Sequence, residues 1–306
     1  MKLILLLLLI LLVSDAFRSP LVKSVNYHIS RDCNYHCKFC FHTRKNVDIL
    51  SLNEAKNGIK LMKEAGMEKI NFAGGEPFIN DIMLGELCRY SHGLGLAVSI
   101  ISNGSLIKPY WMEFYGEYVD VLGVSIDSFK PEVNAAIGRG GDGNKHLDRV
   151  MKVRDMREEQ SITFKINTVV CALNWEEDMT DFIHHLHPQR WKCFQVLILK
   201  EENSGGANEL RDARGLTVSR EQFNSFIQRH QGFDGILVPE PNELMQNSYL
   251  LLDEKLRFLN SANGGKVPTE SILDVGVEKA LGQAGFDHGA FQKRGGVYNW
   301  SRERKG

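Results

Sequence analysis

The sequence has no strong excess of charge of either sign. Its 306 residues include 37 Lys and Arg against 38 Asp and Glu, which gives a formal net charge of −1. This balance excludes a protein that binds nucleic acid through a globally basic surface, and we expect no direct binding to nucleic acid. Apolar residues make up 43% of the chain, enough for a sizeable core, so the chain is not expected to be disordered.

A disulfide framework is also lacking. Cys88, Cys171 and Cys193 are scattered through apolar segments, where buried free thiols are the usual explanation. The other three of the six cysteines are clustered within residues 33–40. A chain of this length with this pattern is typical of a reducing compartment.

No apolar run reaches the length of about 20 residues that spans a bilayer. The apolar run Leu3–Val13 is followed by Ser14, Asp15 and Ala16, a pattern similar to the core of a secretory signal peptide. Secretion would expose the clustered thiols to oxidation. We therefore expect residues 1–20 to be a membrane-surface anchor that faces the cytosol, with a cleaved signal as the alternative.

From residue 21 to 200 the chain alternates between strand-like and helix-like segments, which indicates an α/β fold with a parallel sheet. Six such units are too few for a closed eight-stranded barrel, so the sequence predicts a partial (β/α)₆ barrel. Residues 201–306 are predicted to be a C-terminal extension that packs on the barrel and closes it. Within that extension we expect a linker or surface loop at 201–215, helix 219–229, an apolar helix-like segment at 247–260 and otherwise irregular structure. The expected strands are 24–30, 68–73, 96–101, 119–126, 162–170 and 191–199.

The clustered thiols Cys33, Cys37 and Cys40 have the spacing C-x₃-C-x₂-C on a loop that directly follows the first expected strand. Soft thiolates bind iron–sulfur clusters, zinc or Cu(I). Three thiols would leave one iron of a cubane open to a small ligand. The alternatives are a zinc knuckle completed by His36 or His42, or three free thiols.

Further polar motifs follow the next three strands. Gly74-Gly75-Glu76-Pro77 follows the second strand, Ser102 ends the third, and Ser125 with Asp127 ends the fourth. Because active sites of βα barrels lie at the carboxyl ends of the strands, these motifs are expected to meet the cysteine loop at one rim. Glycines allow close backbone approach, and Glu76 offers an acceptor for an ammonium group.

Polar residues also alternate with apolar ones along four strands. Side chains at i and i+2 share one face of a strand, so the polar sets should point into the barrel if helices cover the apolar face. A triphosphate would offset this buried positive charge, whereas the alternative is a solvated sheet face. The residues predicted to bind such a substrate are Asn26, Lys69, Lys165, Asn167, Arg190 and Lys192.

The cysteine spacing, the aromatic residue Phe39 before the last cysteine and the Gly-Gly-Glu-Pro motif resemble the radical S-adenosylmethionine superfamily. The runs 26–28, 33–42, 66–77, 102–106, 137–140, 164–167, 190–192, 248–252 and 294–296 resemble, within it, the viperin family of antiviral nucleotide dehydratases. The similarity extends from about residue 22 to 301.

The resemblance implies a [4Fe–4S] cluster on Cys33, Cys37 and Cys40 and S-adenosylmethionine bound at the open iron. It implies cofactor contacts from the rim motifs and from Arg139, and it makes Tyr249 a candidate hydrogen-atom donor late in the reaction. The cofactor-binding residues expected on this basis are Gly74, Gly75, Glu76, Ser102, Ser125 and Arg139.

The resemblance further implies that a 5′-deoxyadenosyl radical takes the ribose 4′ hydrogen of a nucleoside triphosphate. Loss of the 3′ hydroxyl would leave a 3′-deoxy-3′,4′-didehydro nucleotide that terminates viral RNA chains. CTP is the expected substrate, and UTP or another nucleotide is the alternative. A third hypothesis is a zinc-stabilised, membrane-associated scaffold.

Family members also have partners. The resemblance implies a reductase or flavodoxin-type electron donor, the cytosolic Fe–S assembly machinery, and a location on the cytosolic face of the endoplasmic reticulum and on lipid droplets. Two departures from the family bear on these expectations. The N-terminal apolar run is short, and Trp300 is the last aromatic residue before Arg302–Gly306, so recruitment through a terminal tryptophan is in doubt.

Overall fold

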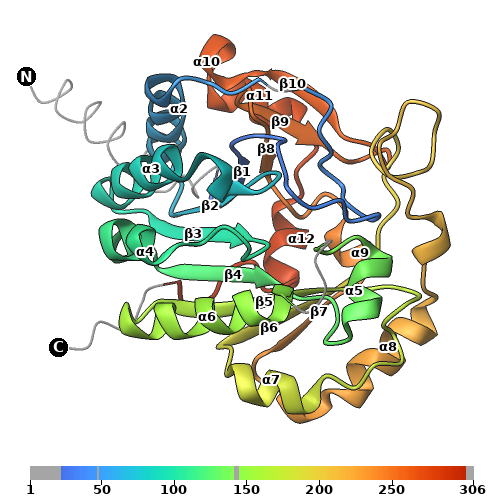
Figure 1. Cartoon of the computed structure of the whole chain (residues 1–306). Coiled ribbons are helices and arrows are strands. Elements are labelled where there is room, and N and C mark those ends of the chain that lie inside the picture. Colours follow the sequence, from blue (N-terminus) through green and yellow to red (C-terminus); the bar gives the residue numbers. More distant parts are fainter. Residues whose placement is uncertain (1–21, 47, 141–144, 301–306) are drawn as a thin grey trace, which may run out of the picture.

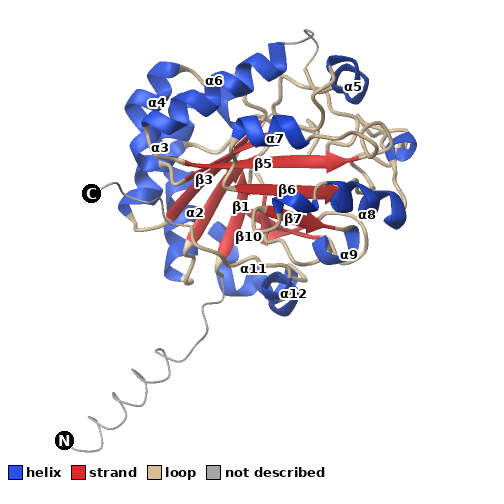
Figure 2. Cartoon of the chain, turned by 90° about the horizontal axis from the view of Figure 1, so that it is seen from below, coloured by secondary structure: helices blue, strands red, loops and turns tan. Residues whose placement is uncertain are grey.

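The computed structural model describes residues 22–46, 48–140 and 145–300, and they form one curved, mostly parallel sheet with helices on its outer side (Figures 1 and 2). The strand order is β10-β9-β8-β1-β2-β3-β4-β5-β6-β7. The anchor expected at residues 1–20 lies outside the described residues. None of the helices in the described part of the chain is long and apolar enough to cross a membrane.

The predicted partial barrel is confirmed, and its six parallel strands follow one another in sequence order. A seventh parallel strand, β7, extends the sheet beside β6. The strands are β1 (Ser24–His28), β2 (Lys69–Ala73), β3 (Ala97–Ser102), β4 (Val121–Ser125), β5 (Thr163–Val170), β6 (Arg190–Gln195) and β7 (Leu237–Glu240).

Helices alternate with these strands. The α-helices are α2 (Leu52–Glu64), α3 (Asp81–Gly93), α4 (Pro109–Tyr115), α5 (Pro131–Ile137), α6 (Lys145–Glu159), α7 (Thr180–Leu186) and α8 (Arg220–Arg229). Short 3₁₀ helices are η1 (Pro77–Asn80), η2 (Gly116–Tyr118), η3 (Arg214–Leu216) and η4 (Gln231–Phe233). Ser51 and Glu54 form a capping box at the start of α2, and Gly66 takes a left-handed φ of 99° just after that helix ends.

The C-terminal part is more regular than expected. It contains β8 (Leu251–Leu252), β9 (Arg257–Asn260), β10 (Val267–Ser271), α9 (Asn242–Met245), α10 (Ile272–Val275), α11 (Val277–Gln283) and α12 (His288–Lys293). Strand β8 pairs with β1 in parallel, and β9 and β10 continue the sheet in antiparallel pairing.

The helix-like segment predicted at 247–260 is wrong. The carboxylate of Asp253 accepts the backbone N–H groups of Lys255 and Arg257, both at 2.9 Å, and Leu256 has a positive φ of 56°. This turn separates β8 from β9 and prevents a continuous helix. Tyr249 consequently lies on the loop before β8.

The two faces of the sheet differ in polarity. Tyr27, Phe72, Phe164 and Trp191 are at most 1% exposed and face the helices. On the opposite, inner face, the register places Asn26 beside Asn71 and Ser99, and it places Gly123 beside Lys165 and Arg190. All six predicted substrate residues therefore share the inner face. A Cβ on Gly123 would lie 2.7 Å from Cδ1 of Ile101 and 3.4 Å from Cε of Lys165, so the missing side chain makes room mainly for Ile101.

Candidate active site at the carboxyl ends of the strands

The Gly-Gly-Glu-Pro turn after β2 lies directly against the cysteine loop. The N–H of Gly75 donates to the carbonyl oxygen of Ser30 (2.9 Å), and the N–H of Glu76 donates to that of Asp32 (2.6 Å). A Cβ on Gly75 would lie 1.9 Å from the Asp32 carbonyl oxygen, and Gly74 has a φ of 141°. Only glycines permit this approach, so the motif fixes the start of the loop.

The three thiols are free and lie near enough to one another for their charges to interact. Burial, as the main cause, raises the pKa of Cys33 to about 11 and that of Cys37 to about 12, and the nearby charge of Cys40 acts in the same direction. Burial also raises the pKa of Cys40. Free thiols in this state hold their protons at neutral pH, and binding of a metal centre would release them.

Cys33 is positioned from β3. Nδ2 of Asn103 lies 3.9 Å from the Cys33 sulfur and donates to Oδ1 of Asn34 at 2.9 Å. Asn103 itself is held by its backbone N–H, which donates to the Glu76 carboxylate at 2.7 Å. Asn103 was not singled out as a site residue from the sequence, although it adjoins Ser102 at the expected rim.

Cys37 is positioned from the end of α5. The N–H of His36 donates to the carbonyl oxygen of Gly138 (3.2 Å), and that of Lys38 donates to the carbonyl oxygen of Ile137 (2.9 Å). Gly138 has a φ of 87°, and a Cβ there would lie 2.5 Å from the His36 carbonyl oxygen. The backbone around the second cysteine is therefore shaped by a glycine on another element.

Arg139 follows that glycine and is buried beside the thiols. It pairs with the carboxylate of Asp127, which also accepts the N–H of Val169 at 2.9 Å. The guanidinium lies 5.9 Å from the centroid of the Phe39 ring. Asp127 thus holds Arg139 against the loop. The half-buried Ser125, the last residue of β4, lies two positions before Asp127.

Glu76 is more fully bonded than the sequence suggested. One carboxylate oxygen accepts the Ser102 hydroxyl (2.7 Å) and the N–H of Phe78 (3.1 Å), and the other accepts the N–H of Asn103. Burial raises the pKa of Glu76 to about 7, while these hydrogen bonds act against the increase. In this arrangement Glu76 joins the rim after β2 to the rim after β3.

The donor set suits an iron–sulfur cluster. In a cubane each thiolate binds its own iron, and three thiolates leave the fourth iron open. Three soft sulfurs on a loop fixed by two other rim segments are therefore a suitable holder for such a cluster.

A buried cationic cluster lies on the inner face of the sheet. It consists of the buried Lys69, Lys165 and Lys192, the half-buried Arg190, and Arg294, which reaches this face from the end of α12. Within the described residues, Glu240 is the only carboxylate that pairs with any of them: it contacts Lys192, and its Oε1 lies 3.5 Å from a guanidinium nitrogen of Arg294. Burial, reinforced by mutual repulsion, holds the pKa values of Lys69 and Lys165 well below the ordinary lysine range.

Several polar atoms around the cationic cluster have no hydrogen-bond partner among the described residues. They include Oδ1 of Asn71, Oδ1 of Asn167, Oγ of Ser99 and Nε of Arg190. Lys165 likewise has no hydrogen-bonding or ion-pairing partner in that part of the chain. Buried polar groups are normally satisfied, so a concentration of exceptions on one face indicates a surface that a polar ligand completes.

Two tyrosines from the C-terminal part contact the cationic cluster. The Tyr249 hydroxyl accepts from Nζ of Lys192 at 2.9 Å, and the Arg294 guanidinium lies 3.6 Å from the centroid of the Tyr249 ring. The Tyr298 hydroxyl accepts from Nζ of Lys69 at 2.8 Å, and Arg190 lies 4.1 Å from the Tyr298 ring centroid. Burial raises the pKa of both tyrosines.

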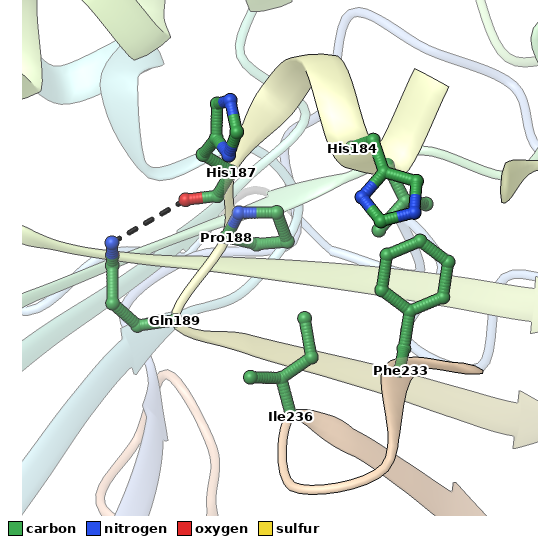
Figure 3. A pocket seen from close by; sticks show the side chains of 7 residues that line it. His184, His187, Pro188, Gln189, Phe233 and Ile236 are labelled. Atoms are coloured by element: carbon green, nitrogen blue, oxygen red, sulfur yellow. Dashed lines mark hydrogen bonds between the residues drawn. The ribbon is translucent and has the colours of Figure 1, made fainter. Parts of the chain in front are cut away.

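A separate cavity of about 330 Å³ is lined by other residues. They are the end of α7, the Pro188-Gln189 turn and the side chains of Phe233 and Ile236 (Figure 3). Gln189 and Ile236 directly precede β6 and β7, so this cavity lies at the amino ends of the strands. The thiols and Glu76 lie at the carboxyl ends, and the cavity is therefore not part of the candidate site.

The family model of the Radical SAM superfamily matches residues 27–183. The chain is 50% identical over 294 residues to the S-adenosylmethionine-dependent nucleotide dehydratase RSAD2 of Oncorhynchus mykiss, with 95% of this chain and 83% of the relative covered. It is 52% identical over 290 residues to the protein of the same name from Danio rerio (94% and 80% covered). A nucleotide dehydratase of Flammeovirga pacifica is 34% identical over 289 residues (92% and 97% covered).

Solved structures show the same fold at low sequence identity. Streptococcus suis SuiB bound to S-adenosylmethionine matches with a TM-score of 0.63 at 14% identity, with 86% of this chain and 67% of that chain covered. Histidine-tagged anSMEcpe with bound AdoMet matches with a TM-score of 0.60 at 15% identity, with 78% and 73% covered. These likenesses support the barrel architecture.

Proposed function

The chain belongs to the viperin family of S-adenosylmethionine-dependent nucleotide dehydratases, within the radical SAM superfamily, and we propose that its substrate is CTP. The product of this proposal is the 3′-deoxy-3′,4′-didehydro analogue of CTP, a nucleotide that terminates viral RNA chains. The protein would thereby act in antiviral innate defence. The family assignment makes the chain a radical SAM enzyme with a [4Fe–4S] cluster and S-adenosylmethionine as cofactors.

The cluster would be held by Cys33, Cys37 and Cys40. When bound and reduced, it supplies the reductive cleavage of S-adenosylmethionine that starts radical chemistry. The protein binds, orients and shields the reactants. S-adenosylmethionine would lie against the rim residues Gly74, Gly75, Glu76, Ser102, Ser125 and Arg139. Their position at or just beyond the carboxyl ends of β2, β3 and β4, the end of the barrel that carries the cysteine loop, supports this assignment.

The observation that carries the substrate class is the buried cationic cluster with a single carboxylate partner. Several buried cations destabilise a protein unless counter-charge accompanies them. A triphosphate supplies this charge, and Arg forks and Lys ammonium groups both bind phosphate oxygens well. We assign the phosphates to Lys69, Lys165, Arg190 and Lys192, and add Arg294 because it shares Glu240 with Lys192.

The ribose and base would contact Asn26 and Asn167, and Asn71 joins them. Asn71 stands beside Asn26 across β1 and β2, and the side-chain oxygens of Asn71 and Asn167 have no partner among the described residues. An amide can accept from a ribose hydroxyl or a base amino group and can donate to a carbonyl. These amides are therefore suited to orient a nucleoside beside the phosphates.

Tyr249 is the proposed late hydrogen-atom donor. Its hydroxyl accepts from Lys192 and its ring lies against Arg294, so both of its ends are fixed by members of the cationic cluster. Burial raises its pKa, which keeps the phenol protonated at neutral pH. A fixed, protonated phenol beside the substrate phosphates is able to deliver hydrogen to a nearby ribose.

The test is an anaerobic assay of the reconstituted full chain with dithionite, S-adenosylmethionine and each of the four ribonucleoside triphosphates in turn. The proposal predicts 5′-deoxyadenosine and a dehydrated nucleotide with CTP in excess over the other three. Preferential turnover of UTP or of a purine nucleotide would show that this nucleotide, and not CTP, is the substrate. Zinc without iron or sulfide in anaerobically purified protein would support the scaffold hypothesis instead.

We also propose that residues 1–20 attach the enzyme to the cytosolic face of the endoplasmic reticulum and to lipid droplets. The support is the apolar run Leu3–Val13 in the sequence. The proposed partners are a reductase or flavodoxin-type electron donor and the cytosolic Fe–S assembly machinery. Flotation of the full chain with liposomes, compared with a chain from which residues 3–13 are deleted, tests the anchor. Equal flotation would contradict it.

A further inference from the structure

The peptide around the third cysteine, Cys40, is held mainly by side chains from the distant C-terminal half of the chain. We call residues 39–43 the strap. Nδ2 of Asn203 donates to the carbonyl oxygen of Phe39 at 3.0 Å, and Nζ of Lys266 donates to that of Phe41 at 2.7 Å. A guanidinium nitrogen of Arg31 donates to the carbonyl oxygen of Thr43 at 2.9 Å. Three alternate carbonyl groups around Cys40 therefore each receive one side-chain donor.

Glu202 joins these donors into one network. One of its oxygens accepts the N–H and the hydroxyl of Thr43, at 2.9 and 2.7 Å. Its other oxygen accepts from Arg31 at 3.2 Å and lies 3.7 Å from Nζ of Lys266. The Glu202 and Lys266 side chains are each 3% exposed. A carboxylate so buried and so fully bonded fixes the atoms around it.

Arg31 is fixed from a second direction. Its Nε donates to Oε1 of Glu254 at 2.9 Å, and Nδ2 of Asn46 donates to the same oxygen at 2.8 Å. Glu254 lies in the turn between β8 and β9, and Lys266 lies just before β10, so the network joins the strap to the antiparallel end of the sheet. The strap is thus bonded both to the 199–203 turn and to β8–β10.

The other two cysteines have different supports. Cys33 is contacted by Asn103 after β3, and the backbone at Cys37 is bonded to Ile137 and Gly138 after α5. Both supports belong to the parallel barrel. The strap around Cys40 is the part of the loop that depends on residues beyond 199.

We propose that Glu202, Asn203 and Lys266 are positioning residues that hold Cys40 in place as a cluster ligand, so that retention of the cluster depends on the C-terminal half of the chain. This inference rests on the proposed cluster ligands. Outer contacts of this kind orient the ligands of a metal centre, and their loss weakens metal binding. None of the three residues needs to touch the substrate for this role.

The test compares iron release from the anaerobically reconstituted full chain and its variants. Lys266→Met keeps the length of the side chain and removes the donor to the strap, and Glu202→Gln keeps the shape and removes the charge. Each is expected to speed anaerobic transfer of iron to a chelator by about 10- to 100-fold. Both are also expected to change the electron paramagnetic resonance spectrum of the reduced cluster.

Matched controls come from the same segments. Glu209→Gln lies in the same 201–212 loop, where the carboxylate accepts from Ser204, the Glu201 N–H and the backbone at Gly205 and Gly206, and Lys255→Met removes an exposed pair with Asp48. Both are expected to release iron as the wild type does. Lys266→Arg, which keeps charge and donors, should restore slow release. Melting temperatures and CTP binding of the iron-free variants show whether each one is folded.

The outcomes separate the two proposals. Wild-type protein that takes up no iron would overturn the proposed cluster and this inference together. Wild-type protein that holds iron, with Lys266→Met releasing it no faster, would overturn the inference alone. If Glu202→Gln does not fold, the comparison of Lys266→Met with Lys266→Arg decides whether the inference holds.

Discussion

The cysteine loop and the cationic cluster are bonded in opposite ways. The loop is connected by hydrogen bonds to the turns after β2, β3 and α5 and to the strap contacts from beyond residue 199. The cationic cluster has a single carboxylate partner in the described part of the chain and is surrounded by unpaired amide and hydroxyl oxygens.

This contrast indicates different roles. The loop is a rigid support for a cofactor, and the cationic cluster is a surface that binds a ligand. A loop whose backbone is fixed by hydrogen bonds from several elements keeps its shape with nothing bound. A face on which several cations share one carboxylate, beside acceptors without partners, is unfavourable by itself and becomes favourable when a polyanion is added. Substitutions in the loop should therefore affect the cofactor, whereas substitutions in the cationic cluster should affect the nucleotide.

The largest expected effect is that of Cys37→Ala. Loss of one of three ligands should abolish iron binding and cleavage of S-adenosylmethionine, while CTP binding remains because the cationic cluster is intact. Iron analysis, 5′-deoxyadenosine assays and calorimetry measure the three properties. The matched control Cys88→Ala, a buried thiol on α3, should retain iron. Full iron content in Cys37→Ala would contradict the assignment of the loop.

Lys165→Met should weaken the binding of CTP and stabilise the nucleotide-free protein. Loss of a charged hydrogen-bond donor to phosphate should raise the Kd for CTP about 10- to 100-fold, since such bonds contribute about 1.5–3 kcal/mol. Replacement of a buried, unpaired lysine by an apolar side chain should stabilise the nucleotide-free protein by about 1–4 kcal/mol. Calorimetry and denaturant unfolding measure the two effects.

The control for that variant is Lys60→Met, an exposed position on α2 whose ammonium group lies 3.8 Å from Glu64. It should change neither property. Lys165→Met with wild-type affinity for CTP would remove Lys165 from the binding surface. A loss of stability would show that the unpaired state of Lys165 is not unfavourable.

Glu76→Gln tests whether the hydrogen bonds of the cysteine loop and its rim stabilise the protein. The carboxylate accepts from Ser102, Phe78 and Asn103, and an amide would present N–H groups to at least one of these donors. We expect a loss of stability of about 1–3 kcal/mol and weaker binding of S-adenosylmethionine. Denaturant unfolding is the measurement, with the exposed Glu68→Gln as control. Unchanged stability would mean that Glu76 does not join the two rim segments.

The smallest expected effect is a dependence of the affinity for CTP on pH. Burial lowers the pKa of Lys192 to about 8, and Glu240 acts against this. Above that pH the free protein has lost a proton that bound triphosphate would restore, so the affinity for CTP should fall above about pH 8, by up to about tenfold per pH unit for one proton.

The stability of the nucleotide-free protein should change in the opposite direction. The unfolded lysine keeps its proton up to its ordinary pKa of 10.5, so between about pH 8 and that value the unfolded state binds more protons and stability rises with pH. Calorimetry in two buffers of different ionisation enthalpy should detect proton uptake with CTP, and Lys192→Met should reduce it, since burial lowers the pKa values of Lys69 and Lys165 as well. Proton release by the wild type would contradict this account.

The barrel and its inner face could be predicted from sequence because both depend on local periodicity. Once a strand is recognised, the two-residue alternation decides which side chains share a face, and this placed Lys165 with Asn167 and Arg190 with Lys192. The rim motifs could be predicted equally well, since the carboxyl ends of parallel strands meet at one edge. The family resemblance added Arg139 and Tyr249, whose own neighbourhoods in the sequence carry no such signal.

The partners of those residues could not be predicted, because they come from non-local pairing. Glu240 ends β7, a strand that was not expected from the sequence, and Asp127 was noted as a rim residue without its bond to Arg139. Glu202 and Asn203 lie in a segment that was expected to be a linker, yet they are 2% and 0% exposed. A polar, glycine-containing run resembles a surface loop until the groups that it bonds are known.

The most direct test of the central claim compares CTP with cytidine as ligands of the anaerobically reconstituted full chain in the presence of S-adenosylmethionine. If the cationic cluster is a triphosphate site, CTP should bind at least about 100-fold more tightly than cytidine, and Lys165→Met should remove a large part of that difference. Equal affinities for CTP and cytidine would show that the buried cations do not bind the phosphates.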